Sequence, residues 1–283
     1  MSITSPCGGT HQHRSGGEAM LARPVDVRDQ GPRSLPLLAR YLREVRERKG
    51  VSRAQLAARG FMSASLIEKW ELEGRVPTPE KLAAWFDALE VPFLYRKKII
   101  SLCQPEAYLL DGPCPAVTLE DERHLERHLD PAFYLLSSTC DLVGANAEFG
   151  RYFPGLAPVP ASAGRPANFL EWLMVDPRAR LAVRNWYPRA HVCLSEFRIE
   201  SPGVVAADRI EKIVEVCREA PEFEQMWSTD PSDDQIADPT FTLWDKQNGV
   251  WADYVLRVFG CEYPRRRWQF RVLTPVVGES GCA

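Results

Sequence analysis

The sequence of 283 residues contains no apolar run that approaches the roughly 18 residues needed to cross a bilayer. Its first twenty residues, MSITSPCGGTHQHRSGGEAM, also lack the hydrophobic segment of a secretory signal peptide and have the composition of a flexible tail. We therefore expect a soluble, cytoplasmic protein with no membrane partner, with tails at residues 1–33 and 278–283.

Motifs of catalysis and metal binding are also missing. There is no Gly-rich phosphate loop, nucleophile elbow or HExxH motif, so we expect neither an enzyme nor a cofactor. The eight cysteines include no CxxC pair and are most simply reduced thiols, although Cys103 and Cys114 flank the expected hinge and leave a redox pair open. His124 and His128 stand four apart without a third ligand, which is more typical of a solvated helix face than of a metal site.

The charge is unevenly distributed. The net charge is −3, but residues 35–104 hold thirteen Lys and Arg against eight Asp and Glu, a local excess of +5. A basic module on an acidic body confines attraction for phosphate to one part of the chain. A chain of this length is comfortable as two domains, each with its own core.

One stretch, SRAQLAARGFMSASLIEKWE (residues 52–71), has the pattern of a helix-turn-helix. Ser52 and Ser63 are suited to cap two short helices, and Gly60 breaks the chain between them. Ala57 is small where the helices cross, and the wedge between the helices would be filled by Met62, Ile67 and Trp70.

The opposite face of the second helix carries short or polar side chains, which suit base edges and phosphates. These candidate DNA-binding residues are Ser63, Ala64, Ser65, Glu68 and Lys69. A helical hairpin built only for packing would share the apolar spacing, but the segments on either side make that alternative weaker. One recognition helix reads few base pairs, so we expect a homodimer on double-stranded DNA.

With the flanking LREVRERKGVS (42–52) and GRVPTPEKLAAWFDALEV (74–91), the region resembles the phage-repressor/Cro type of DNA-binding domain, the XRE family. The resemblance implies an all-α five-helix bundle over residues 34–104. Its helices are expected at 36–49, 53–59, 64–72, 79–89 and 92–102.

Specific roles also follow from this resemblance. It implies an ion pair between Arg46 and Glu71, and it places Arg53 where a phosphate contact is favoured. The family usually has glycine at the position of Phe61, where the first helix ends in a left-handed residue. Here the glycine is Gly60, one place earlier, so the geometry of the turn is not fixed by the sequence.

After an expected linker at residues 105–129, the pattern changes to that of an α+β domain over residues 130–277. A hairpin and three further strands indicate an antiparallel sheet, with helices packed over one face. Strands are expected at 133–138, 141–146, 241–246, 250–260 and 267–275, and helices at 147–152, 168–174, 177–200, 206–219 and 221–227.

Three segments of this half resemble the MmyB-like ligand-binding domain of XRE regulators, a PAS-like fold. They are NFLEWLMVDPRARLAVRNW (168–186), APEFEQMW (220–227) and VLTP (272–275). A departure lies in DPTFTLW (238–244), where the family usually has His-Pro and a glycine. The resemblance implies a multidomain transcription regulator that binds a small apolar ligand such as a fatty acid.

We expect an apolar pocket in the C-terminal domain, whose occupancy changes DNA affinity. Its expected lining is Phe133, Leu135, Phe169, Trp172, Leu173, Trp186, Phe223 and Trp227. Six of the eight tryptophans lie in this half, but such residues fill ordinary cores as readily as pockets. The alternative function is a DNA-bound adaptor whose C-terminal domain binds a protein partner through an exposed apolar patch.

Overall fold

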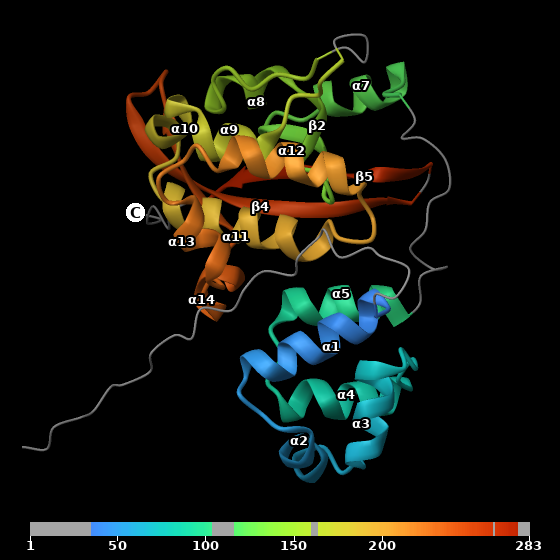
Figure 1. Ribbon diagram of the computed structural model, residues 1–283. Coiled ribbons are helices and arrows are strands. Elements are labelled where there is room, and N and C mark those ends of the chain that lie inside the picture. The colour runs from blue at the N-terminus through green and yellow to red at the C-terminus, as the bar shows by residue number, and fades with distance from the viewer. Residues whose placement is uncertain (1–34, 104–115, 160–163, 263, 277–283) are drawn as a thin grey trace, which may run out of the picture.

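The computed structural model describes residues 35–103, 116–159, 164–262 and 264–276. A small helical part precedes a larger part built on a sheet, and the two lie side by side (Figure 1). The expected tails at 1–33 and 278–283 lie outside the described residues, as do residues 104–115 of the expected linker and Cys7, Cys114 and Cys282. Within the described part, no helix is long and apolar enough to span a membrane.

The N-terminal part is the helical helix-turn-helix region that the sequence predicted. Its helices are α1 (Leu37–Arg48), α2 (Arg53–Arg59), α3 (Ala64–Leu72), α4 (Pro79–Ala88) and α5 (Phe93–Cys103). Leu42, Leu56, Ile67 and Trp85 have no exposed surface and form the centre of its core. The side chains of Ser52 and Ser63 accept hydrogen bonds from the third residue of α2 and α3, as expected of helix caps.

The turn between α2 and α3 contains an unusual backbone conformation. Gly60 has a φ of −94°, whereas Phe61 has a φ of +49°. The left-handed position therefore falls at residue 61, even though the side chain there is phenylalanine. Phe61 is 90% exposed, so packing against the residues that the structure describes does not offset the strain.

The C-terminal part is an α+β domain with a five-stranded antiparallel sheet. The strands are β1 (Ala132–Leu136), β2 (Asp141–Ala145), β3 (Thr240–Asp245), β4 (Val250–Glu262) and β5 (Arg265–Pro275). Their order is β2-β1-β5-β4-β3, which pairs the first strand with the last, and Phe133 is the register partner of Arg271.

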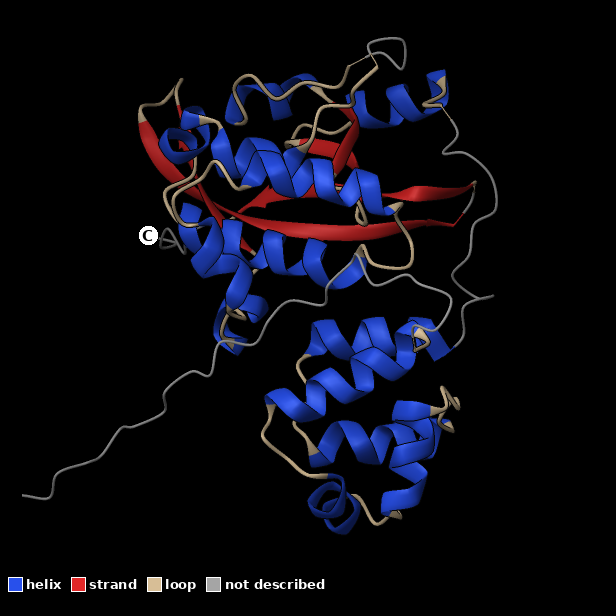
Figure 2. Cartoon of the chain, viewed as in Figure 1, coloured by secondary structure: helices blue, strands red, loops and turns tan. Residues whose placement is uncertain are grey.

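Helices cover the inner face of this sheet, where the main hydrophobic core forms (Figure 2). They are α8 (Ala147–Tyr152), α9 (Phe169–Val175), α10 (Pro177–Ala182), α11 (Trp186–Glu200), α12 (Ala207–Cys217) and α13 (Phe223–Ser228). A further helix, α14 (Asp233–Ala237), packs against α11. The strand edges and helix bounds agree with most of the predicted ranges to within one or two residues.

The structure corrects the predicted linker and the prediction that helices cover one face only. Residues 119–126 of the expected linker form helix α7 (Leu119–Glu126), which begins at a capping box on Thr118. Leu125 of α7 packs with Trp268 and Phe270 on the outer face of the sheet. That face is thus covered over β1, β2 and β5 but exposed over much of β3 and β4.

The single helix predicted over 177–200 is also wrong, because the chain divides there into α10 and α11. Between them Val183 forms a β-bridge with Leu243, and the Arg184 N–H donates to the carbonyl of Thr242. Pro188 lies in the first turn of α11, where its missing N–H costs no helical hydrogen bond. The proline was the available signal for this new helix start.

Candidate functional site

Helix α3 presents the face that the sequence assigned to DNA. Ser63, Ala64, Ser65, Glu68 and Lys69 are all exposed, so the structure brings these five predicted residues together on one surface. The opposite side of α3 is buried through Ile67 and Trp70. Helices α2 and α3 lie on the side of the helical part away from the sheet, so the C-terminal part leaves this face uncovered (Figure 1).

The sixth predicted residue, Arg53, does not extend freely into solvent, because its guanidinium is bound to Glu71. Its Nε donates to Oε2 of Glu71 at 2.9 Å, and only 32% of its side chain is exposed. The same carboxylate takes two hydrogen bonds from Arg46, and this contact raises the pKa of the Arg46 guanidinium. Any phosphate contact by Arg53 must use the part of its guanidinium that Glu71 does not occupy.

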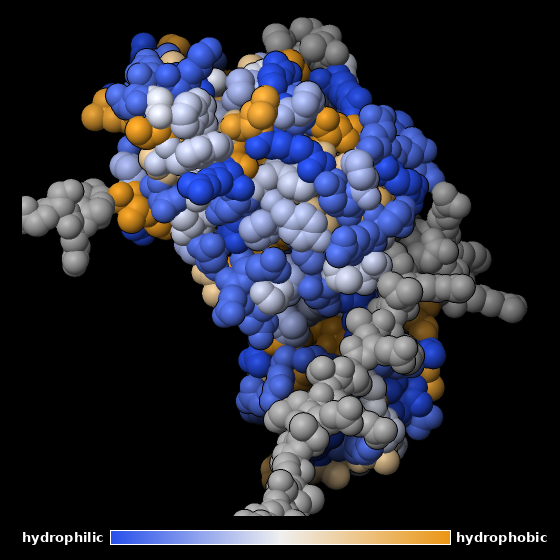
Figure 3. All heavy atoms as spheres, turned by 90° about the vertical axis from the view of Figure 1, so that its left-hand side faces the viewer, coloured by the Kyte–Doolittle hydropathy of each residue, from blue (hydrophilic) through white to orange (hydrophobic). Residues whose placement is uncertain are grey.

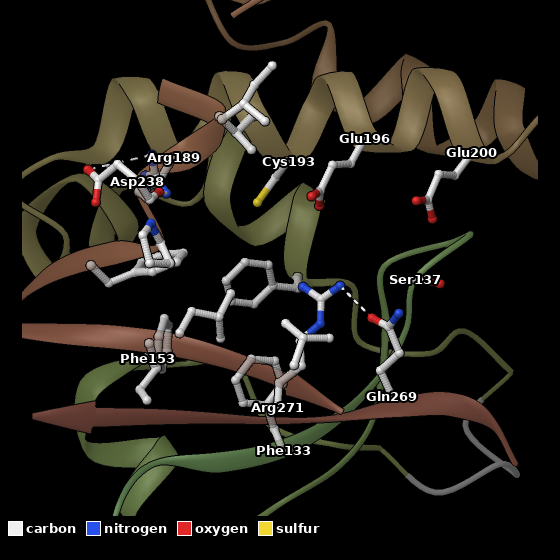
Figure 4. A pocket seen from close by; sticks show the side chains of 18 of the residues that line it. Phe133, Ser137, Phe153, Arg189, Cys193, Glu196, Glu200, Asp238, Gln269 and Arg271 are labelled. Atoms are coloured by element: carbon white, nitrogen blue, oxygen red, sulfur yellow. Dashed lines mark hydrogen bonds and ion pairs between the residues drawn. The ribbon is translucent and has the colours of Figure 1, made fainter. Parts of the chain in front are cut away.

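A cavity of ≈ 250 Å³ lies between α11 and the inner face of the sheet (Figure 4). One face of α11 forms its roof, because residues 189, 192, 193, 196 and 200 recur at helical spacing. Its full lining is Lys97, Phe133, Ser137, Phe153, Phe169, Arg189, Val192, Cys193, Glu196, Glu200, Ile236, Asp238, Pro239, Phe241, Leu256, Val258, Gln269, Arg271 and Leu273.

The cavity has an apolar region and a charged region. Aromatic and aliphatic side chains come from the sheet and from α9 and the end of α8, namely Phe133, Phe153, Phe169, Phe241, Leu256 and Leu273. Charged side chains come from α11, from β5 and from the helical part. Such a division suits a ligand with one apolar end and one polar end.

Arg271 is a buried cation in the cavity wall, only 8% exposed. It points from β5 toward α11, and its Nη2 donates to Oε1 of Gln269 at 3.0 Å (Figure 4). Its Nε is buried and has no hydrogen-bond partner among the described residues. A buried donor of this kind is costly to leave unpaired, which makes a ligand oxygen a favourable partner.

Arg189 stands at the other end of the roof and is mostly satisfied by the protein. It donates to the backbone carbonyls of Gln235 and Asp238, and its Nη2 lies 3.9 Å from the Asp238 carboxylate. Its Nε, like that of Arg271, lacks a partner in the described part of the chain.

Glu196 and Cys193 lie beside each other on the roof and face the sheet (Figure 4). Burial raises the pKa of the Glu196 carboxyl, an effect that the positive charge of Arg271 partly offsets. Burial also raises the pKa of the Cys193 thiol to about 12, so it is a neutral thiol at physiological pH and a poor nucleophile.

The predicted pocket residues only partly coincide with this lining. Phe133 and Phe169 line the cavity, whereas the remaining six expected residues do not: Leu135, Trp172, Leu173, Trp186, Phe223 and Trp227. Five of these six lie within the packed core, and Trp227 packs against it. Polar groups explain two of the placements, since the Trp172 and Trp186 indole N–H groups donate to the backbone carbonyls of Pro154 and Leu173.

Sequence reasoning missed the charged residues of the cavity, above all Arg189, Glu196 and Arg271. A signal was present in β5, where Gln269, Arg271 and Leu273 alternate with the apolar Trp268, Phe270 and Val272. The apolar set packs under α7, which leaves the set containing Arg271 to face the main core. A charge on a strand face that must be buried indicates a site.

The two histidines of α7 and the following turn pack against the sheet. His124 Nδ1 lies 2.7 Å from the Tyr134 hydroxyl, and the His124 and His128 rings contact each other and Phe270. No group of three or more potential metal ligands occurs within the described residues.

Two family models match the chain, one in each part. Residues 37–92 match a helix-turn-helix domain family, and residues 119–248 match the MmyB-like transcription regulator ligand binding domain. The second match begins at α7, in agreement with the packing of that helix on the sheet. No curated protein matches the sequence.

Proposed function

We propose that this chain, a ligand-responsive transcription regulator that joins a helix-turn-helix domain to an MmyB-like ligand-binding domain, binds DNA sequence-specifically and senses a fatty acid. The observation that carries the proposal is an exposed recognition face on α3 together with a cavity that has both an apolar region and an arginine Nε with no hydrogen-bond partner among the described residues. We expect it to act by binding rather than by catalysis.

On the DNA side, α3 would enter the major groove. Lys69 and Ser65 would meet base edges, Ser63 would position the start of the helix, and Ala64 and Glu68 would lie beside them. All five side chains are exposed, which supports this assignment. Arg53 would hold a phosphate with the part of its guanidinium that is not bound to Glu71.

We propose that the DNA-bound form is a homodimer on a pseudo-palindromic site. A single α3 of nine residues can reach only a few base pairs, and a second copy doubles the sequence that is read. The proposed dimer also gives ligand binding a means to act, because a change in the spacing of two recognition helices changes the fit to both half-sites.

On the ligand side, the apolar region would hold an acyl chain and Arg271 would hold the carboxylate. A carboxylate oxygen would accept a hydrogen bond from the buried Nε, and charge-assisted bonds of this kind are the stronger ones. The volume of ≈ 250 Å³ is a little below the ~300–1,000 Å³ of ordinary small-molecule pockets, which favours a chain of medium length. We also propose that the domain is PAS-like, an assignment supported by an antiparallel sheet with its ligand cavity beneath helices.

The test begins with selection of an operator from a random duplex pool by the full-length protein. Operator affinity is then measured with delipidated protein, with and without fatty acids of eight to sixteen carbons, while tryptophan fluorescence reports ligand binding. We expect binding of a carboxylate ligand and a change in operator affinity. Binding of matched alcohols as tightly as acids would contradict the role of Arg271, and no effect of any bound acid on operator affinity would contradict ligand-responsive regulation.

One observation favours the adaptor alternative. The part of the outer sheet face that α7 leaves open exposes Trp244, Trp251 and Phe259, and the first two rings contact each other at 5.2 Å between centroids. Exposed aromatic side chains of this kind are common at protein interfaces. On the side of the molecule seen in Figure 3, however, hydrophobic residues form separate small groups within a largely hydrophilic surface. A partner that binds the sheet and is lost on Trp251→Asp, with no ligand effect, would favour the adaptor.

A further inference from the structure

The C-terminal end of α11 is attached to the DNA-binding part of the chain. Tyr41 of α1 donates its hydroxyl to the carbonyl of Ile199 at 2.7 Å. Lys98 of α5 donates to the carbonyls of Glu200 and Pro202 at 2.9 and 2.8 Å. The last carbonyls of a helix have no partner within it and carry its partial negative charge, so these donors satisfy and stabilise that end of α11.

Apolar packing reinforces the attachment. Ile199 is 3% exposed and belongs to the same hydrophobic cluster as Tyr41, Tyr95 and the rest of the helical part. Gly203, just beyond the end of α11, allows the Leu37 side chain to approach closely, because a Cβ on this residue would lie 2.4 Å from Leu37 Cδ2. The helical part is therefore seated on one end of α11 rather than merely tethered to it.

The same helix is the roof of the cavity. Glu196 and Glu200 point from α11 into the cavity (Figure 4). Lys97 of α5 forms an ion pair with Glu200, and both side chains belong to the cavity lining. The DNA-binding part thus contributes a cation to the wall of the cavity in the other domain.

The Lys97–Glu200 pair differs in strength from the contacts beside it. The Lys97 side chain is 48% exposed, so the pair is screened by solvent and contributes little to stability by itself. Lys98 and Ile199, in contrast, are almost completely buried. A ligand that reaches this end of the cavity can replace the weak pair without having to break the buried contacts.

We propose that the cavity is a composite site of both domains, in which the Lys97–Glu200 pair closes the end next to α5 and a bound ligand opens it, so that ligand occupancy changes how α5 is held on α11. The inference rests on the proposed function, since it assumes that the cavity binds a ligand. The carboxylate held by Arg271 takes Lys97 as its second cationic partner, in place of Glu200. The orientation of α3, which is carried by α5 through the helical bundle, then depends on occupancy.

The experiment uses the full chain, the selected operator and decanoic acid as the probe. Operator affinity is measured with and without decanoate for wild type, Lys97→Gln, Glu200→Gln and the double variant. Lys212→Gln is the matched control, because Lys212 also pairs with an acid, Asp208, but on an exposed face of α12. We expect decanoate to change wild-type and Lys212→Gln affinity by a factor within roughly 5–150, the usual range of such coupling.

In the variants that lack the pair, we expect most of this change to be absent. Ligand-free Lys97→Gln should already show the operator affinity of decanoate-bound wild type, and the double variant should differ little from either single one. Hydrogen exchange of α5 amides should be faster in Lys97→Gln than in Lys212→Gln, which tests the role of the pair without any ligand.

The possible failures are distinguishable. If wild type binds decanoate but its operator affinity does not change, the proposed ligand-responsive function fails. If wild type responds and Lys97→Gln responds equally, the proposed function stands and the composite site is overturned. If decanoate does not bind, the fatty-acid assignment fails, and unchanged operator affinity together with unchanged α5 exchange in ligand-free Lys97→Gln would still overturn the role of the pair.

Discussion

Arg46 and Glu71 form a two-point ion pair inside the helical domain, with Nε to Oε1 at 2.6 Å and Nη2 to Oε2 at 2.8 Å. The pair joins the last turn of α1 to the end of α3, and Glu71 has no exposed surface. Arg46 also donates to the carbonyl of Val51, which leads into α2. The recognition helix is thus fixed to the helices behind it by one buried carboxylate.

Removing this carboxylate should be strongly destabilising. Glu71→Ala removes the two-point partner of the buried Arg46 and leaves it only the half-exposed Glu47 at 3.4 Å and the Val51 carbonyl, so we expect a loss of ~3–5 kcal/mol in the free energy of unfolding of the helical domain. Urea denaturation of the full chain, followed by exchange of amides in α1 and α3, measures the effect. Glu68→Ala on the exposed face of the same helix is the control and should change stability by less than ~0.5 kcal/mol. A melt of Glu71→Ala that coincides with that of Glu68→Ala would mean that the pair does not support the fold.

The left-handed backbone of Phe61 gives a second prediction. The left-handed conformation destabilises a non-glycine residue by ~1–2 kcal/mol, and the exposed Phe61 ring does not offset this by packing against the described residues. We expect Phe61→Gly to stabilise the domain by about 1 kcal/mol, because part of the gain is lost to the greater freedom of glycine in the unfolded chain. Gly60→Ala is the comparison variant: the Gly60 φ of −94° suits any residue, and the added Cβ would lie 2.6 Å from Met62 Cε, the end of a flexible side chain that can move, so the change in stability should be small. Thermal melts of the two variants measure both effects, and destabilisation by Phe61→Gly would show that the ring makes a contact that matters.

Contacts to DNA should separate into two kinds. Lys69→Ala and Ser65→Ala should cost ~1–3 kcal/mol on the selected operator and little on random DNA. Arg53→Ala should weaken binding to all sequences similarly and reduce the salt slope by about one. Binding titrations at several salt concentrations provide both quantities. Equal losses on operator and random DNA for all three variants would refute the assignment of α3 as the reading helix.

The lining of the cavity can be tested by filling it. Leu256→Trp places a large side chain in the apolar region, and we expect decanoate affinity to fall at least tenfold, or ~1.4 kcal/mol. Trp172→Phe is the matched comparison, because Trp172 was predicted to line the pocket but packs in the core. It should lower stability through loss of the hydrogen bond to Pro154 and leave decanoate affinity unchanged. If Trp172→Phe lowered decanoate affinity and Leu256→Trp did not, the lining predicted from the sequence would be the better one.

The partly buried carboxyl of Glu196 predicts that stability depends on pH. Burial raises its pKa above the ordinary 4.5, so the folded chain binds this proton more tightly than the unfolded chain does. Its contribution to stability is therefore complete below pH 4.5 and is lost as the pH rises from there through the folded-state pKa. Glu196→Gln remains neutral, and we expect its stability relative to wild type to increase from pH 4 to pH 8. Urea titrations across that range, with exposed Glu215→Gln as the control, would contradict the prediction if the two variants behave alike.

The sequence predicted the fold well where local signals agree with one another. Ser52 and Ser63 cap helices that also have the correct apolar spacing, and α3 and α8 have the expected bounds. The failures lie where tertiary contacts decide. The break at Val183 depends on a bridge to Leu243, and the cavity lining depends on which face of β5 meets α11 rather than α7. Trp172 and Trp186 were expected in the pocket because they are large and apolar, but both pack in the core, where their indole N–H groups donate to the carbonyls of Pro154 and Leu173. The spacing of residues in the sequence does not predict these two hydrogen bonds.

Ile199 completes the hydrophobic core of a domain to which it does not belong in sequence. A chimaera that transfers residues 35–103 to another sensor would lack this side chain and the two carbonyls that accept from Lys98, and would expose an apolar surface and an ammonium that had lost these acceptors. The DNA-binding half is thus not an interchangeable cassette. A chimaera made from this chain has to include the last turn of α11 together with the helical part.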